Sequence, residues 1–276
     1  MREHKPSPFY PPARWLVGKI YGKMAVVGAE NLPDGEAVIV GNHTQIHGPI
    51  ACELYFPGSH YTWCAGQMMR FKEVPGYAYQ DFWSQKPLST RWLYKIAAYL
   101  IAPLAVFIFN NANTIPVYHD ARLLTTFRTT LQRLQEGARV VIFPEQDKKY
   151  NHILYEFQDR FVDVARLYYH QTKKEISFVP LYIAPSLKKM VIGAPVRFDP
   201  AAPIEAERAR ICDAMKAEIT ALAESLPRHR VVPYRNIRKK DYPYNIPDEV
   251  TLPLKSQWWT TASSACARST NPVFPT

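Results

Sequence analysis

The hydrophobic positions of the chain form short, continuous runs that alternate with longer stretches of helical spacing. Apolar runs rich in β-branched residues and bounded by turn residues predict strands. These runs lie at 37–40, 60–64, 114–117, 139–143, 178–185 and 191–198. Apolar residues spaced three and four apart predict helices at 14–26, from 49 onward, 120–137, 153–168 and 204–226. This alternation is typical of an α/β domain with a largely parallel central sheet flanked by helices.

The same pattern divides the chain into three regions. Residues 1–25 are expected to form an N-terminal amphipathic segment, with an interfacial helix whose lysines lie at head-group level. Residues 26–227 are expected to form the α/β domain, with an aromatic and apolar insertion at about 76–112. Residues 228–276 form a basic, Pro-rich tail, for which we expect an extended wrap and then a disordered end.

The insertion contains the longest apolar run, residues 96–109, and this run includes Pro103. It is shorter than the roughly 20 residues that a membrane-spanning helix needs, so the sequence predicts no spanning segment. Aromatic residues such as Trp92 and Tyr99, with Arg91 at the start, favour insertion into one leaflet of a bilayer. A hairpin that thickens the core, or a lid over an acyl chain, is the alternative.

The net charge of the chain limits which binding partners are expected. The 276 residues include 34 Lys and Arg against 24 Asp and Glu, which gives a formal net charge of +10. Such a surface can bind nucleic acid, anionic lipid or a phosphorylated substrate. The basic run at 228–240 lacks any recognisable nucleic-acid docking motif, so nucleic acid is not an expected partner.

Cysteine usage and the start of the chain bear on location. The four cysteines show no C-x-x-C pairing, which argues against a zinc ribbon and a disulfide scaffold. Free thiols suit a reducing compartment. The first residues contain no apolar leader. The expected location is therefore cytoplasmic, peripheral on the inner face of a membrane.

Two predicted strands end in residues that can carry chemistry. The strand at 38–40 leads into Asn42 and His43, and the strand at 140–142 leads into Glu145. Ligands of open α/β sheets bind beyond the carboxyl ends of the strands. If these two strands are neighbours, a general base and a carboxylate meet at one edge of the sheet.

Four short blocks extend this observation over roughly residues 26–198. They are GAENLPDGEAVIVGNH at 28–43, IPV at 115–117, FPEQDK at 143–148 and FVPL at 178–181. Their order and spacing resemble the lysophospholipid and glycerophosphate acyltransferase superfamily, of the 1-acylglycerol-3-phosphate acyltransferase kind. Each block alone is weakly specific, whereas the ordered set is fairly specific.

The resemblance implies direct acyl transfer. His43 would remove a proton from an alcohol of a glycerophosphate, lysophospholipid or related acceptor, which attacks an acyl thioester at a membrane surface. Acyl-CoA or acyl-carrier protein would be the co-substrate, without a further cofactor or metal. Polar and basic residues of the blocks would bind the acceptor. They are Asn42, His47, His119, Arg122 and Lys148.

The sequence departs from the family pattern at the residue that orients the base. The family has Asp five residues after the His, and here that position is Gly48. Three carboxylates could replace it: Glu145, where the family also has an acid, Asp147, at a position where the family has none, and Glu53. His47 is a further candidate. The alternative is a catalytically inactive, lipid-binding member of the same fold.

The histidines His43 and His47 have the i, i+4 spacing of a zinc site. Gln45 stands where a metalloprotease has its general-base Glu, and Gly48 and Pro49 follow at once, which places both histidines on a loop. The sequence therefore argues against metal binding by these two histidines.

Overall fold

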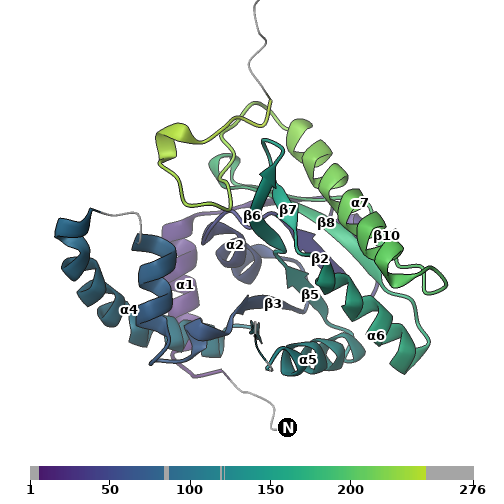
Figure 1. Cartoon of the computed structure of the whole chain (residues 1–276), viewed down its shortest axis with the longest axis horizontal. Coiled ribbons are helices and arrows are strands. Elements are labelled where there is room, and N and C mark those ends of the chain that lie inside the picture. The colour runs from purple at the N-terminus through teal and green to yellow at the C-terminus, as the bar shows by residue number, and fades with distance from the viewer. Residues whose placement is uncertain (1–5, 84–86, 119, 121, 247–276) are drawn as a thin grey trace, which may run out of the picture. The chain divides into compact units, whose positions relative to one another are not determined.

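The computed structural model describes residues 6–83, 87–118, 120 and 122–246, and a compact unit extends to Asn245. The described residues form an eight-stranded sheet with the order β1-β9-β8-β2-β5-β3-β4, in which β10 pairs with β8 (Figure 1). Most neighbouring strands are parallel, and β8 is antiparallel to β9 and β10. The predicted α/β architecture with a largely parallel sheet is confirmed.

Most strands coincide with the predicted runs, but β1 falls in a stretch predicted as helix, and the run 191–198 contains the end of β9 and the separate strand β10. The strands are β1 (Ala25–Val27), β2 (Val38–Gly41), β3 (His60–Ala65), β4 (Thr114–Val117), β5 (Arg139–Ile142), β8 (Ser177–Ala184), β9 (Lys189–Ile192) and β10 (Val196–Arg197). The helices are α1 (Tyr10–Tyr21), α2 (His47–Tyr55), α3 (Val74–Ala78), α4 (Arg91–Asn111), α5 (Leu123–Gln135), α6 (Asp163–Thr172) and α7 (Ile204–Glu224).

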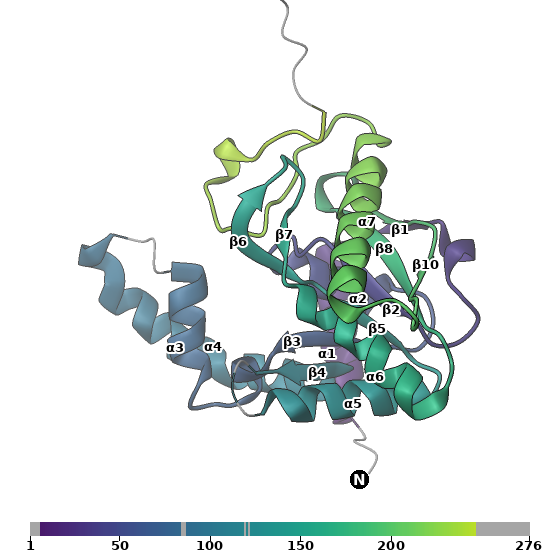
Figure 2. The ribbon, with the colours of Figure 1, turned by 45° about the vertical axis from the view of Figure 1, so that its right-hand side comes forward.

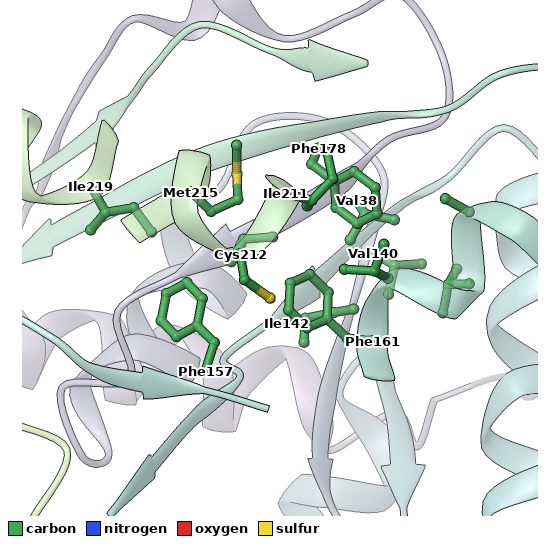
Figure 3. Packing of buried hydrophobic residues seen from close by; sticks show 14 of the residues in the cluster. Val38, Val140, Ile142, Phe157, Phe161, Phe178, Ile211, Cys212, Met215 and Ile219 are labelled. Carbon is green, nitrogen blue, oxygen red and sulfur yellow. The ribbon is translucent and has the colours of Figure 1, made fainter. Parts of the chain in front are cut away.

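The central strands are buried because helices cover both faces of the sheet. Alternate residues of β2 point to opposite sides, so Val38 and Val40 belong to one core cluster and Ile39 to another. The first cluster includes residues of α7, such as Met215, which pack onto the strands in Figure 3. The second includes Cys52 of α2. This packing fixes the central strands, from whose ends the candidate site emerges.

One predicted helix is wrong over its first half. Residues 153–161, assigned to a helix by spacing, instead contain the strand β7 (Tyr155–Phe157), which pairs with β6 (Glu145–Tyr150) in a hairpin. The turn explains the difference, because the Asn151 side chain accepts hydrogen bonds from the backbone N–H groups of Ile153 and Leu154. Such Asx turns compete with helix formation.

The N-terminal helix also ends earlier than expected. It stops at Tyr21, and Gly22 follows with a φ of 78°. The residues after it, Ala25–Val27, form an edge strand beside β9. Gly22 is in the left-handed region that glycine readily adopts, which accounts for the helix end.

Helix α4 corrects the expected length of the apolar segment. It covers 21 residues, and the longer stretch Leu88–Asn111 has a mean hydropathy of 1.8 in its best window, only 11% of which is buried. By length and composition alone, this stretch is sufficient to cross a membrane. Pro103 lies inside the helix without ending it. In both views α4 stands at one side of the sheet (Figures 1 and 2).

Candidate functional site

The ends of β2 and β5 bring His43 and Glu145 together. The two strands are parallel neighbours, with Val38 opposite Val140 and Val40 opposite Ile142. The chains leaving them meet at one edge, where the His43 backbone N–H donates to Glu145 Oε1 at 2.7 Å. The other carboxylate oxygen accepts from the Tyr155 N–H at 2.8 Å. The expectation that these two strands are neighbours in the sheet is therefore confirmed.

The carboxylate contacts the backbone of His43 and not its ring. Both Glu145 oxygens bind backbone N–H groups, and the buried His43 Nδ1 has no hydrogen-bond partner among the described residues. Asp147 is half exposed and pairs with Arg235 at 3.7 Å. Glu53 faces α1, where it accepts from the Tyr10 hydroxyl at 2.8 Å. Glu145 therefore lies within hydrogen-bond reach of His43, as expected, but it binds the backbone N–H, and no carboxylate among the described residues binds Nδ1 of the ring.

Aromatic rings surround the imidazole instead. Phe143 lies at 5.6 Å between ring centroids with an interplanar angle of 71°, and Tyr234 lies at 5.2 Å with an angle of 82°. Both contacts are edge-on, a favourable arrangement for aromatic pairs. The side chains that contact this ring among the described residues are therefore aromatic and not charged.

The backbone after His43 is held in an unusual conformation. Thr44 and Gln45 have φ values of 46° and 55°, so two consecutive non-glycine residues are left-handed. Each such residue costs on the order of 1 kcal/mol, and such strain is concentrated at functional sites. The turn leads into α2 and leaves no room at Gly48, where an added Cβ would lie 2.4 Å from the His43 carbonyl oxygen. An Asp at that position does not fit this backbone.

Burial changes the protonation of both groups. It lowers the pKa of His43 to about 4, and an interaction of the imidazole with the Gln45 backbone opposes this shift in part. It raises the pKa of Glu145 to about 7, although the two backbone hydrogen bonds favour the ionised form. At neutral pH the imidazole is therefore neutral, as a general base must be.

These shifts predict how stability depends on pH. The unfolded His43 binds a proton below about 6.5 and the folded one only below about 4, so its contribution to stability is lost as the pH falls through that interval. A His43→Ala protein lacks this loss. Relative to the wild type, its free energy of unfolding should rise by about 2 kcal/mol between pH 7 and pH 4.5.

The measurement is urea unfolding of both proteins at the two pH values. The opposite contribution of Glu145, whose pKa is raised, is present in both proteins and cancels in the difference. If the free energies of unfolding of the variant and the wild type differ by the same amount at pH 7 and at pH 4.5, the imidazole of His43 is not held neutral by the fold.

The remaining predicted residues have different places. The Asn42 amide is buried and binds the backbone of Ile183, accepting from its N–H at 2.7 Å and donating to its C=O at 3.0 Å, so it is not available to substrate. His47 begins α2 and lies 5.9 Å from the Tyr21 ring. Lys148 is exposed and lines a cavity beside α7 that does not include His43. His119 lies outside the described residues.

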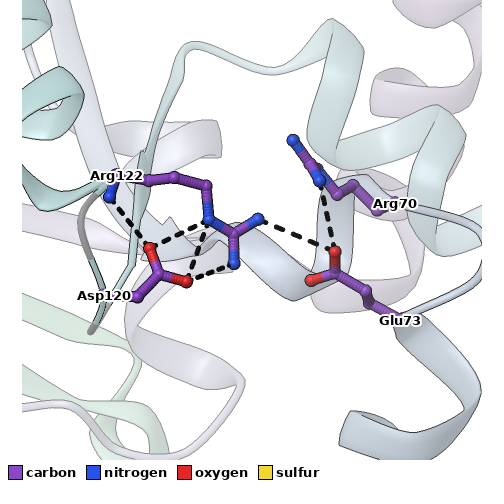
Figure 4. A network of polar contacts seen from close by, with 4 residues as sticks. All are labelled: Arg70, Glu73, Asp120 and Arg122. Carbon is purple, nitrogen blue, oxygen red and sulfur yellow. Dashed lines mark hydrogen bonds and ion pairs between the residues drawn. The ribbon is translucent and has the colours of Figure 1, made fainter.

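Arg122 belongs to a chain of charged groups beyond β4, drawn in Figure 4. Its guanidinium binds Asp120 at 2.7 Å and lies 3.7 Å from Glu73, which also binds Arg70 at 3.3 Å. The same guanidinium lies 3.9 Å from the centre of the Tyr118 ring. The pair with Asp120 lowers the pKa of that exposed carboxyl to about 2. Arg122 and Arg70 are the residues of this network that could bind an anion beside the second block, residues 115–117.

Sequence reasoning did not assign roles to Tyr234, Phe143 or Arg70. Phe143 lies inside the third block, but an apolar residue at a strand end is usually core. Tyr234 belongs to a tail without hydrophobic periodicity. Because ring contacts between distant segments leave no mark on local spacing, only the position of Tyr234 in the Pro-Tyr-rich tail could have drawn attention to it.

Comparison with known proteins gives a likeness of fold but no match of sequence. No family model and no curated protein sequence matches the chain. Among solved structures, the fold is similar to that of the 1-acyl-sn-glycerophosphate (LPA) acyltransferase PlsC from Thermotoga maritima, with a TM-score of 0.41 and 16% sequence identity. The match covers 80% of this chain and 84% of that chain.

Proposed function

We propose that the protein is an acyltransferase that moves a fatty acyl group from an acyl thioester to an alcohol of a glycerophosphate, a lysophospholipid or a related acceptor. The supporting observation is the meeting of His43 with Glu145 at the carboxyl ends of β2 and β5. The ordered resemblance of the four blocks agrees with this chemistry. Acyl-CoA or acyl-carrier protein is the proposed donor.

His43 acts as the general base in this reaction. Because Nδ1 is buried while the residue as a whole is half-buried, Nε2 is the nitrogen that takes the proton from the acceptor hydroxyl. The alcohol oxygen attacks the thioester carbonyl, the carbon–sulfur bond breaks, and the imidazolium returns the proton to the leaving thiolate. General base catalysis of this kind contributes roughly 10²–10⁴-fold.

Glu145 supports the base through the backbone. Its carboxylate joins the turn that carries His43 to the β6–β7 hairpin, so it fixes the position of the catalytic turn. The acceptor phosphate is assigned to the charged network at the end of β4, where Arg122 and Arg70 lie against the Tyr118 ring and where the phosphate would replace Asp120 and Glu73 as their partner. Guanidinium groups suit a phosphate because they bind it with two parallel hydrogen bonds.

A second function, lipid binding without turnover, is favoured by one observation. The imidazole has no carboxylate partner among the described residues, and in a well-studied catalytic triad disabling that partner lowers turnover by about 10⁴. This alternative keeps the acceptor site and the membrane contact but not the reaction.

The test is acyl transfer by the purified full-length chain. Radiolabelled acyl-CoA and acyl-carrier protein are each supplied with vesicles containing glycerol 3-phosphate, lysophosphatidic acid or another lysophospholipid. Labelled diacyl or monoacyl product supports the acyltransferase. Saturable binding of the acceptor without any labelled product supports the lipid-binding alternative.

The protein is also proposed to act at a lipid surface on the cytoplasmic face of a membrane. Large apolar side chains remain exposed on α1 and α4, which meet where the Tyr10 and Phe107 rings lie 6.4 Å apart. They include Trp15, Leu16, Ile20, Trp92, Leu93, Ile96, Tyr99, Leu100 and Leu104. An exposed apolar area of this kind marks an interaction surface. Its lysines and arginines suit anionic lipid.

Replacing Leu100 and Leu104 together with Asp should abolish co-sedimentation with anionic vesicles. The leucines are 75% and 59% exposed, so the change leaves the core intact and removes apolar contact with lipid. The matched control is Leu124→Asp on α5, where an equally exposed leucine lies outside this surface. Equal binding by both variants would contradict the assignment of α4. Carbonate extraction of cell membranes separates peripheral binding from a spanning α4.

A further inference from the structure

The segment that follows α7 crosses the candidate site. Residues 231–243, here called the strap, run beside β6 in both ribbon views (Figures 1 and 2). The ion pair between Asp147 of β6 and Arg235 of the strap agrees with this placement. The strap lies outside the four blocks that resemble the acyltransferases.

The two ends of the strap are fixed to the core. The His229 N–H donates to Asn245 Oδ1 at 2.7 Å, and the Val231 N–H donates to the Pro243 carbonyl at 2.8 Å. Both His229 and Asn245 are buried. The His229 ring is within hydrogen-bond distance of the Tyr182 hydroxyl at 2.8 Å. The strap is therefore a loop whose two ends are held together and anchored.

The turn that follows His43 binds the middle of the strap. Gln45, held in a left-handed conformation, places its side-chain amide near the carbonyl oxygens of Pro233 and Arg235, at 3.4 and 3.5 Å. The same amide donates to the Tyr242 hydroxyl at 3.2 Å. The strained turn and the strap thus support each other.

Tyr234 lies at the centre of this arrangement. Its ring meets the His43 imidazole edge-on at 5.2 Å and the Tyr155 ring at 6.1 Å. Phe143, which directly follows β5, contacts the imidazole from another segment, so two aromatic residues enclose the His43 ring. Gly48 admits no side chain, and both Glu145 oxygens are engaged with backbone, so packing is what remains to orient the base.

We propose that Tyr234 is the positioning residue for His43, in place of the carboxylate that Gly48 excludes, and that the strap is therefore part of the site. The proposal rests on the proposed acyl transfer for its kinetic consequence. Its structural part, the enclosure of the imidazole by Tyr234, holds whether or not the protein turns over.

The first readout needs no activity. Removing Tyr234 admits water to the imidazole, so the pKa of His43 should rise by about one unit toward its ordinary value of about 6.5. Nuclear magnetic resonance of ¹³C-histidine-labelled protein measures it, with the His43 signal identified by its absence from His43→Ala. The titratable and charged groups around this region are Glu145 and Asp147 from β6, Tyr155 from β7, and Tyr234 and Arg235 from the strap.

The variants are Tyr234→Ala, Tyr234→Phe and, as a control away from the site, Tyr169→Ala on α6. We expect Tyr234→Ala to raise the pKa of His43 and to lower kcat about 10-fold or more with a smaller effect on KM. Tyr234→Phe keeps the ring and should restore both values to those of the wild type. Tyr169→Ala should change neither. Should Tyr234→Ala not fold, Gln45→Ala loosens the strap without altering the core and should move the pKa of His43 in the same direction.

Two results would overturn the proposal. One is an unchanged pKa of His43 in folded Tyr234→Ala. The other is faster acyl transfer by Tyr234→Ala than by the wild type, which would make the strap an inhibitory cover. Absence of transfer by the wild type itself refutes the proposed function only, since the pKa of His43 still reports on the enclosure by Tyr234.

Discussion

A His43→Ala protein is expected to transfer acyl groups at least about 100-fold more slowly than the wild type while keeping its fold. The loss follows from the removal of the proposed general base at the ends of β2 and β5, and 10²–10⁴-fold is the usual contribution of such a base. Initial rates of labelled product formation at saturating acyl donor and acceptor measure it.

The fold should survive because the contact that joins the two strand ends uses the His43 backbone N–H, which Ala retains. Circular dichroism and a thermal melt at pH 7 verify this. The matched control is His170→Ala on an exposed position of α6, which should transfer at the wild-type rate. A folded His43→Ala protein with the wild-type rate would remove His43 from the mechanism.

Introducing an Asp at Gly48, five residues after His43, should damage the protein and not improve it. The new Cβ would meet the His43 carbonyl oxygen at 2.4 Å and the Phe143 ring at 3.2 Å, so the turn must move. Forced overpacking of this kind costs about 1–3 kcal/mol, and an unpaired buried carboxylate adds to the cost. We expect a loss of stability of about 3 kcal/mol in urea unfolding, with no gain in acyl transfer.

The control for this change is Gly76→Ala in α3, where an added Cβ has no atom within 4 Å. That variant should match the wild type in stability within about 0.5 kcal/mol. If Gly48→Asp is instead as stable as the wild type and transfers acyl groups faster, the backbone at the turn can accommodate the family arrangement. Packing by Tyr234 would then be dispensable.

The strand ends could be predicted because the signals are local. Short β-branched runs bounded by Gly and Pro located β2 and β5, and parallel alternation placed their carboxyl ends at one edge. Contacts of single atoms could not be predicted in this way. The sequence shows that Glu145 follows a strand, but not that its oxygens bind the backbone of His43 and Tyr155 rather than a ring.

Helix α4 and the strap show two other reasons for failure. The length of α4 was underestimated because Pro103 and the aromatic residues before it seemed to limit the apolar run, whereas one proline removes a single backbone donor. The role of the strap depends on a contact between His43 and Tyr234, which are far apart in the chain. No periodicity records such a contact.

Asn42 shows how one side chain can substitute for a peptide group. The ladder between β2 and β8 ends at the pair of Gly41 and Leu181, and beyond it the amide of Asn42 supplies the one donor and one acceptor that Ile183 would otherwise take from a continuing strand. A side-chain amide offers a donor and an acceptor on separate atoms, as a peptide group does, whereas an ionised Asp offers only acceptors. The backbone is thereby released from the sheet one residue before His43 without leaving Ile183 unpaired. An Asn at this position is thus a requirement of strand termination, independent of any substrate.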